Sequence, residues 1–428
     1  MHKSPLPPTE REIWGSVLLV FLLGMCNVGG MGGSFLASPI LMIIFNFDTI
    51  PAIRTTYCMS LCGAIGNFLT NIRSRKPGSR KPAIDYDVAV LCIPLLISGA
   101  SIGVIANSFL PPIISLSFLI LLCLNSFFKC LRKAIAQYRY ENAEKKAIKV
   151  ATAMAAEGVT ASDTNNSFSI DTDIIEEDLG KDNLENNSKQ TEMEALNIEN
   201  APQPNYSLFP LKRYFEILIL LCIVVGFLLL RGSKAFTSVV DVEFCGGLYW
   251  MIYVFAMASC FIFNCIAQYK LKKEKPDPTI RPQDFDVRKR PVKLSIISFF
   301  AGIMAGFAGT GGGLILNPVF LDLGMTGPVA AATSNFFVLF TAFISVFQTA
   351  IGGTLPLDNG LYFGSLSFFG AMVIASTLKC FVKRYNRTSL ILFLLCVVTM
   401  SGALVVGTYI GYRMMIDPES MTNLGTIC

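Results

Sequence analysis

Stretches of about 20 residues without a charged side chain recur along this chain of 428 residues, and they constrain its fold more than any other feature. A helix of about 20 apolar residues is long enough to cross the hydrocarbon core of a bilayer. A soluble enzyme of this length would instead alternate apolar with polar positions. The sequence therefore predicts an all-α polytopic membrane protein.

Eight of these stretches are uninterrupted and predict full membrane spans. Composition agrees, because 53% of the residues are hydrophobic and only 15% are charged, against about a quarter charged in soluble domains. The predicted spans are Ile50–Ile72, Tyr86–Ala106, Pro111–Leu131, Tyr214–Leu230, Leu248–Tyr269, Pro328–Ile351, Gly360–Cys380 and Ser389–Tyr412.

Two further apolar regions, Ile13–Phe47 and Leu294–Leu323, are interrupted near the middle by glycine clusters. The pieces on either side of the first cluster have roughly 14 residues each, fewer than the 20 or so that a span needs. Together they are too long for one straight crossing. We expect a re-entrant hairpin, or a broken helix pair, in each region. Irregular backbone at membrane depth is tolerated only when it packs in protein or lines a polar cavity.

The two interrupted regions also match each other, which predicts an internal repeat. Aligning Pro39 with Pro318 places three glycines of the first region opposite three of the second. An offset of two residues then brings Thr56 opposite Thr333. The matched glycines are Gly30, Gly32 and Gly33 against Gly309, Gly311 and Gly312, and Cys58 falls opposite Asn335.

Basic segments between the spans predict the topology. Lys and Arg gather at residues 73–81, 270–290 and 379–387, and such loops normally face the cytoplasm. All three share one side only if each glycine-broken region returns to the side it entered from. Five crossings then separate the starts of the two repeats, so the repeats are inverted, which is a common transporter design.

We expect four segments along the chain. Residues 1–131 form the first membrane repeat, residues 213–293 contain two middle spans and a basic loop, and residues 294–428 form the second repeat. Residues 132–212 are expected to be a cytosolic linker that is first basic and then acidic, and largely disordered because it is polar and poor in aromatics. A docking segment for a cytosolic partner is the alternative for this linker.

Several function classes are disfavoured. The net charge of +5 is spread over short loops between spans, which is the positive-inside pattern and not a nucleic-acid surface. The single histidine, His2, leaves no imidazole for a zinc site or a membrane proton relay, and the 13 cysteines show no Cys-x-x-Cys spacing. We predict no metal, no cofactor and no catalytic residue. Asp85, Asp87 and Asp358 lie at span ends, where they are expected to cap helices.

The order of these segments resembles the sulfite exporter TauE/SafE family. The resemblance is carried by GGMGGSFLASPILMIIFNF, PAIRTTYCMSLCGAIGNFLTNIRSRKP and IDYDVAVLCIPLLISGASIGV, and by AGFAGTGGGLILNPVFLDLGMTGPVAAATSNFFVLFTAF in the second half. It implies a carrier or exporter of small sulfur-containing anions such as sulfite or organosulfonates. The first repeat has Arg54-Thr55-Thr56-Tyr57-Cys58 where the second keeps Ser334-Asn335, so the two halves of the site are expected to differ in role.

The glycine clusters are the predicted substrate-binding elements. An anion in a membrane must exchange its hydration for hydrogen-bond donors, and broken helices supply backbone N–H groups and partly positive N-termini. The predicted binding residues are Gly30, Gly32, Gly33, Ser34, Arg54, Thr55, Thr56, Thr310, Gly311, Gly312, Gly313, Thr333, Ser334 and Asn335. The alternatives are close helix packing for the glycines and interhelical hydrogen bonds for the hydroxyl and amide groups. For Arg54 the alternative is snorkelling to the interface.

These observations predict a membrane transporter of small anions, with the lipid bilayer as its other partner. An anion channel, and a receptor or scaffold acting through the acidic linker, are the alternatives. A membrane enzyme is disfavoured, because it would need a nucleophile, a metal cluster or an acid–base pair at membrane depth.

Overall fold

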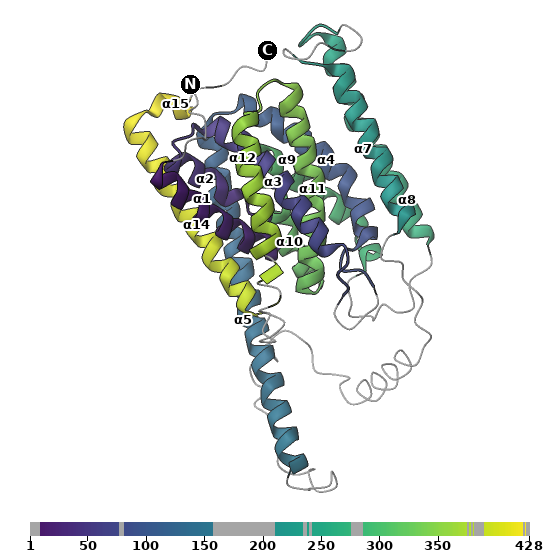
Figure 1. The fold of residues 1–428 in the computed structure, drawn as a ribbon. Coiled ribbons are helices and arrows are strands. Elements are labelled where there is room, and N and C mark those ends of the chain that lie inside the picture. Colours follow the sequence, from purple (N-terminus) through teal and green to yellow (C-terminus); the bar gives the residue numbers. More distant parts are fainter. Residues whose placement is uncertain are drawn as a thin grey trace.

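The computed structural model describes residues 9–76, 81–156, 210–233, 238, 242–274, 286–374, 376–377, 380, 389–422 and 424. Throughout this part the chain is helical and contains no strand (Figure 1). Seven described helices are long and apolar enough to cross a membrane: α4, α5, α7, α8, α9, α11 and α14. The predicted all-α polytopic membrane protein is therefore confirmed.

The helices follow the order expected for two halves around a middle pair. The first half contains α1 (Glu10–Val28), α2 (Ser34–Ile44), α3 (Thr49–Asn71), α4 (Tyr86–Phe109) and α5 (Pro112–Ala156), and the middle pair is α7 (Leu211–Arg231) and α8 (Gly247–Lys273). The second half contains the 3₁₀ turn η1 (Val287–Lys289), α9 (Pro291–Ala308), α10 (Gly313–Asp322), α11 (Gly327–Ile351), α12 (Leu357–Phe369) with its π-helical continuation η2 (Gly370–Ile374), α14 (Ser389–Ile416) and α15 (Pro418–Thr422).

Each predicted span coincides at least in part with a described helix, but α3 and α12 are not among the seven described helices that are long and apolar enough to cross a membrane. The extent of α5 also differs from the prediction. Helix α5 runs to Ala156, well beyond the predicted end at Leu131, because the basic segment after it is also helical. Glu141 on this extension accepts hydrogen bonds from the N–H and hydroxyl of Ser389, 2.9 and 2.6 Å away, and so holds the start of α14.

The acidic part of the linker, residues 157–209, lies outside the described residues, as do most of residues 375–388.

The glycine-broken regions have unequal arms, where the sequence predicted two short arms of similar length. Helices α1 and α9 have 19 and 18 residues, whereas α2 and α10 have 11 and 10. At 1.5 Å per residue the long arms extend about 28 Å and the short arms about 16 Å. The first arm is longer than predicted because Glu12 accepts a hydrogen bond from Thr9 N–H at 2.6 Å, which starts the helix before the apolar run.

Both regions turn back toward the side on which they began. At the end of α2, the carbonyl of Ile43 accepts a hydrogen bond of 2.7 Å from Arg11 at the start of α1. At the end of α10, Asp322 pairs with Lys129 and Lys133 of α5, 3.5 and 3.2 Å away. Helix α1 starts at one end of the bundle and α9 at the other (Figure 1). This is the arrangement that inverted repeats require, although duplication of the sequence stays an interpretation.

The long arms pack across to the opposite half through glycines. Gly99 and Gly103 of α4 face Gly302 and Gly306 of α9, and a Cβ on any of these four would lie 2.1 to 2.2 Å from a carbonyl oxygen of the facing helix. Likewise a Cβ on Gly24 of α1 would lie 2.7 Å from the carbonyl oxygen of Gly370. Small residues let two backbones approach closely, which is how helices associate inside membranes.

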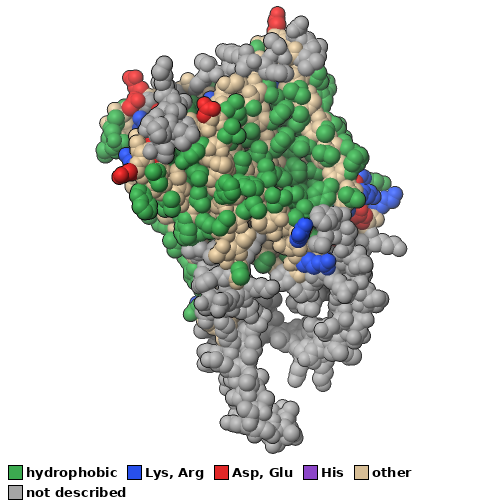
Figure 2. All heavy atoms as spheres, in the orientation of Figure 1, with side chains coloured by type: hydrophobic (Ala, Val, Ile, Leu, Met, Phe, Trp, Pro, Cys, Tyr) green, Lys and Arg blue, Asp and Glu red, His purple; other side chains and the backbone are tan. Residues whose placement is uncertain are grey.

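The two ends of the bundle differ in their chemistry. Described residues of the first two basic loops lie at the end where the extension of α5 leaves the bundle (Figure 1), and we call it the cytoplasmic end. Cys245, in the connection between α7 and α8 at the opposite, outer end, is disulfide-bonded. Disulfides persist in oxidising compartments, so both signals give the same orientation. Between the ends, Figure 2 shows a broad belt of hydrophobic side chains on the visible face.

Candidate functional site

The two helix breaks have the same backbone conformation. Three glycines in each break have a positive φ, between 60° and 76°: Gly30, Gly32 and Gly33 in the first, and Gly309, Gly311 and Gly312 in the second. L side chains disfavour this left-handed region. Close helix packing alone does not require it, because the glycines between α4 and α9 pack more tightly inside regular helix. The backbone turn therefore explains why these positions are glycine.

The breaks meet in the interior of the bundle. A Cβ on Gly32 would lie 3.6 Å from the carbonyl oxygen of Thr310, and a Cβ on Gly313 would lie 2.6 Å from that of Gly30. Gly33 and Gly312 are the N-caps of α2 and α10, so both short helices begin here. Helix N-termini carry partial positive charge and expose N–H groups. We call residues 29–34 together with residues 309–313 the glycine crossing.

A spanning helix of the opposite half holds each break. For the first break, Asn335 of α11 donates a hydrogen bond of 2.8 Å to the carbonyl of Asn27, and Gly30 packs against Ala331. The second break packs against α3, where a Cβ on Gly309 would lie 2.4 Å from Thr56 Oγ1. Asn317 of α10 adds a direct link between the breaks, because its Nδ2 donates to the carbonyl of Gly29 at 2.5 Å. The crossing is thus built from both halves.

Several N–H groups at the crossing stay available. Among the described residues, the hydrogen bonds of the two turns use the N–H groups of Gly30 and Met31 on one side and of Ile315 and Leu316 on the other. Those of Gly32, Gly33, Gly311 and Gly312 take part in none of the turn hydrogen bonds. Glycines let a ligand approach such N–H groups closely because they have no side chain.

Unpaired side-chain polar atoms cluster around the crossing. Within the described part of the chain, the buried atoms without a hydrogen-bond partner include Asn27 Nδ2, Thr310 Oγ1, Asn317 Oδ1, Ser334 Oγ and Asn335 Oδ1. Leaving a buried polar atom unpaired costs about 1 to 3 kcal/mol. Such groups are rare in native proteins and often have a functional role. This clustering fits a place where a polar ligand supplies the missing partners.

The structure brings most of the predicted binding residues to the crossing. Gly30, Gly32, Gly33, Thr310, Gly311, Gly312 and Gly313 form it, and Asn335 contacts it. Ser34 begins α2 there, but its side chain lies outside what the structure describes. Ser334 is buried on α11, next to Asn335.

The remaining predicted residues have other partners or positions. The hydroxyls of Thr55 and Thr56 donate to carbonyls of their own helix, those of Pro51 and Ile53, at 2.9 and 2.6 Å. Thr333 Oγ1 accepts a hydrogen bond of 3.1 Å from Asp85 N–H, at the cytoplasmic start of α4. Arg54 lines a separate cavity at the outer end.

Sequence reasoning predicted Asn335 but missed three other buried asparagines, Asn27, Asn67 and Asn317. Asn27 lies at the end of α1 and Asn317 within α10, both almost fully buried. Asn67 of α3 is also buried, and neither of its amide atoms has a partner in the described part of the protein. An amide inside an otherwise apolar membrane segment was the available signal, because polar groups at that depth are expensive and usually functional.

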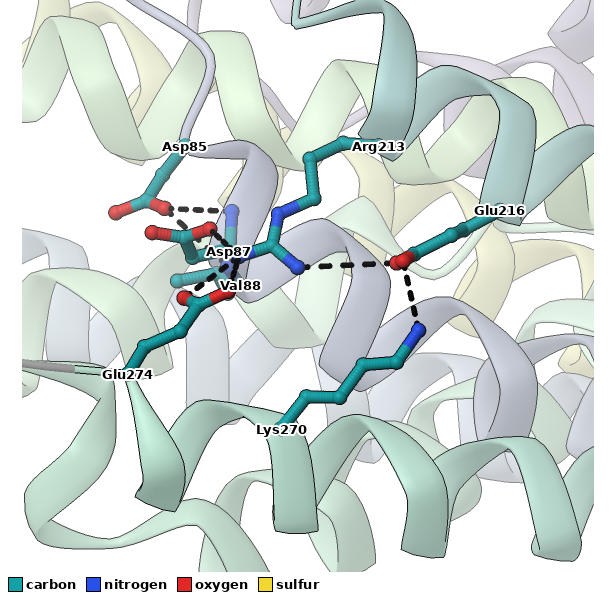
Figure 3. A network of polar contacts seen from close by, with 7 residues as sticks. All are labelled: Asp85, Asp87, Val88, Arg213, Glu216, Lys270 and Glu274. Carbon is teal, nitrogen blue, oxygen red and sulfur yellow. Dashed lines mark hydrogen bonds and ion pairs between the residues drawn. The ribbon is translucent and has the colours of Figure 1, made fainter.

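At the cytoplasmic end, a network of charges joins α4 to the middle helices (Figure 3). Arg213 of α7 pairs with Asp87 at 2.9 Å and with Glu274 at 2.8 Å, and Lys270 of α8 pairs with Glu216 at 2.8 Å. Asp85 accepts hydrogen bonds of 3.2 Å from the N–H groups of Asp87 and Val88, so it caps α4 as expected. Burial and the neighbouring Asp87 carboxylate raise the pKa of Asp85 to about 6.

Comparison with known proteins gives one family. The sequence model described as "Sulfite exporter TauE/SafE" matches residues 16–162 and 208–404. The chain is 26% identical to Sulfite exporter TauE/SafE family protein 2 of Arabidopsis thaliana, over 95% of this chain and 88% of that protein. It is 24% identical to family protein 1 of the same plant, over 99% and 89%. No solved structure matches the chain.

Proposed function

Since the chain belongs to the sulfite exporter TauE/SafE family, we propose that it carries a small, sulfur-containing anion such as sulfite or an organosulfonate across a membrane, and that the anion binds at the glycine crossing. The family is named for export and not for covalent chemistry. Transport by a multi-pass membrane protein is therefore established at the level of the family. The substrate class and the binding site are the proposal.

The observation that supports this site most directly is the contact between the two breaks. The half-length helices α2 and α10 both begin at this contact and run toward opposite ends of the bundle. Their first turns leave N–H groups unused. Fixed N–H dipoles at a helix N-terminus are a common way to bind an anion without a full positive charge. Discontinuous helices that meet near the midplane serve this purpose in several transporter folds.

The residues around the crossing favour an anion over a cation. Its side chains are amides and hydroxyls, and no carboxylate belongs to residues 29–34 or 309–313. A cation site would need oxygen ligands, usually including a carboxylate. An oxyanion would accept hydrogen bonds from the backbone, from Asn27 Nδ2 and from the hydroxyls of Thr310 and Ser334. These three donors are among the buried side-chain atoms without partners in the described structure.

Interlocking of the halves suggests how the site opens. The first break is held by α11 and the second by α3. A rocking motion of one half against the other would therefore move both breaks together and expose the anion to each end in turn. Alternating access of this kind is typical of repeat-based carriers. A channel would instead give flux that does not saturate.

The test compares two glycines with the same backbone strain. Gly312 at the crossing has a φ of 76°, and Gly324, in the loop after α10, has a φ of 94°. An added Cβ meets nothing closer than 3.5 Å at Gly312 and nothing within 4 Å at Gly324. Alanine at either position should cost roughly 1 to 2 kcal/mol of backbone strain. Only Gly312→Ala should reduce uptake of the anion, by at least about tenfold.

Uptake of radiolabelled sulfite, sulfate and a short organosulfonate into proteoliposomes provides the measurement. Saturable flux of one anion, lost in Gly312→Ala and kept in Gly324→Ala, supports both the substrate class and the site. Flux that is equal in the two variants would move the site away from the crossing. If folded protein moves none of the three anions, the sulfur-anion assignment is wrong.

A further inference from the structure

A cavity lies at the outer end of the bundle. It has a volume of about 230 Å³ and lies among the ends of α3, α4, α7, α8 and α11. This is smaller than the roughly 300 to 1,000 Å³ of pockets for drug-sized ligands, so its size suits a small ion. Arg54 of α3 and Arg231 of α7 both line it, and none of its lining residues carries a carboxylate.

Arg231 has donors that the described structure does not use. The residue is only 7% exposed, and its Nε and Nη1 are buried without a hydrogen-bond partner. Its Cζ lies 4.6 Å from the ring centre of Tyr249 and 5.1 Å from that of Tyr253. Stacking on aromatic rings occupies the faces of a guanidinium and leaves the N–H groups in its plane free to form a fork. That fork matches the oxygens of an oxyanion.

Two partly buried arginines in the described part of the protein have acidic partners. Arg213 pairs with Asp87 and Glu274. Arg413, near the outer end of α14, also stacks on a tyrosine, Tyr409, but pairs with Asp48 at 3.3 Å. A buried guanidinium without a counter-charge is strongly unfavourable. Arg231 is more deeply buried than these two and has no acidic partner among the described residues, which a bound anion would explain.

Most serine and threonine hydroxyls that line the cavity already donate to backbone carbonyls, which leaves the two guanidinium groups as its main charged donors. Ser108 donates to the carbonyl of Val104 at 3.2 Å and Thr354 to that of Thr349 at 3.3 Å. Gln348 is bonded to Ser101, whose hydroxyl donates to Gln348 Oε1 at 3.0 Å. Recognition in this cavity would depend on the two guanidinium groups.

The cavity also lies close to the glycine crossing along α3. Arg54 stands in the same turn as Ile53 and Thr56, and both of these contact the position of Gly309, at 3.3 and 2.4 Å from an added Cβ. One helical turn thus links the cavity to the second break. An anion held at the outer end would be next to the proposed transport site.

We propose that Arg54 and Arg231 form an outer binding site for a small oxyanion, separate from the glycine crossing. This proposal rests on the proposed function, since it names where the transported anion docks at the outer end. Sulfur oxyanions and phosphate share the required chemistry, namely several oxygens that accept from a guanidinium fork. Chloride lacks these oxygens and should bind much more weakly.

The protein carries its own reporter for this site. Trp250 packs edge-to-face against Tyr249 with ring centres 5.4 Å apart, and Tyr249 lines the cavity. The other tryptophan, Trp14, is 75% exposed on α1. A full-length Trp14→Phe variant therefore reports on Trp250 alone. We would titrate it in nanodiscs with sodium sulfite, sodium sulfate or sodium phosphate, against sodium chloride at equal ionic strength.

Three substitutions in this background decide the outcome. Arg231→Gln and Arg54→Gln each remove one guanidinium, and Arg413→Gln is the matched control at the same end of the bundle. We expect a saturable fluorescence change with an oxyanion, a Kd raised at least about tenfold in the first two variants, and no change in the control. Arg54 is only partly buried, so its variant keeps the test valid if Arg231→Gln does not fold.

Two results would overturn the outer site: no saturable change with any oxyanion, or the same Kd in all variants. Binding is read at equilibrium and without flux, so it separates this proposal from the first. If Gly312→Ala abolishes uptake but titrates normally, both proposals stand. If the wild type binds but does not transport, only the transport assignment fails.

Discussion

At the residue scale, the described structure places its polar side chains in two kinds of environment. At the cytoplasmic end, charges are paired, as in the network of Arg213 with Asp87 and Glu274. At the crossing and in the outer cavity, polar atoms such as Asn335 Oδ1 and Arg231 Nε are buried without partners. Paired charges stabilise the fold, whereas unpaired polar atoms lower stability and are retained where a ligand needs them.

Asp85 gives a residue-scale prediction about pH. Its pKa is raised from 3.8 to about 6, first by burial and then by the neighbouring Asp87. Between these two values the native state binds more protons than the unfolded chain, so stability falls as the pH rises through this window. Asp85→Asn keeps an oxygen to cap α4 but cannot ionise.

We therefore expect Asp85→Asn to raise the Tm of the purified protein above pH 6 and to leave it unchanged near pH 4. Thermal unfolding in detergent between pH 4 and pH 8 measures the difference. A gain in Tm that is the same at every pH would contradict the assignment, because it would show that the effect does not come from ionisation of this carboxyl.

At the element scale, the sequence predicted the helices well and their ends less well. Six of the eight predicted spans match described helices that are long and apolar enough to cross a membrane, because such a helix must be apolar over a fixed length. The long first arm was missed because Thr9 and Glu12 start α1 through a local hydrogen bond, which hydropathy does not register. Glycine repetition predicted the breaks, but it gave no information on which helix packs against them. Asn335 and Thr333 were both predicted at the crossing, but only Asn335 contacts it. Thr333 meets the start of α4 instead, because hydropathy does not show which face of α11 packs on α4.

The glycines between α4 and α9 give a prediction at this scale. A Cβ on Gly103 would lie 2.1 Å from the carbonyl oxygen of Ile303, whereas a Cβ on Gly226 of α7 would meet nothing within 4 Å. Gly103→Ala should force the two backbones apart and destabilise the protein by about 3 kcal/mol, as overpacking does. Gly226→Ala should leave the Tm unchanged or raise it, because alanine favours helix by up to about 1 kcal/mol. Equal Tm values for the two variants would show that α4 and α9 do not pack in this way.

At the scale of the whole molecule, the two halves form a single interlocked unit. Helix α11 holds the first break, α3 holds the second, and α4 packs on α9. The middle pair α7 and α8 joins the bundle through the Arg213 network at the cytoplasmic end, and at the outer end it supplies Arg231 to the cavity. Every group proposed to handle the anion thus belongs to the described helices or to the two breaks between them. The acidic segment between α5 and α7 lies outside the described residues, and neither proposal includes a residue from it.

This arrangement separates transport from signalling through the linker. We expect that replacing residues 157–200 with Gly and Ser at the same length leaves saturable uptake within about twofold of wild type. The replacement keeps the span between α5 and α7, so it does not pull on the Glu141–Ser389 contact that holds α14. Uptake in proteoliposomes measures it, with Gly312→Ala as the inactive control. If folded protein with the replaced linker loses uptake, the acidic segment is part of the transport mechanism. If the wild type moves no anion at all, a receptor or scaffold acting through this segment becomes the better account of the chain.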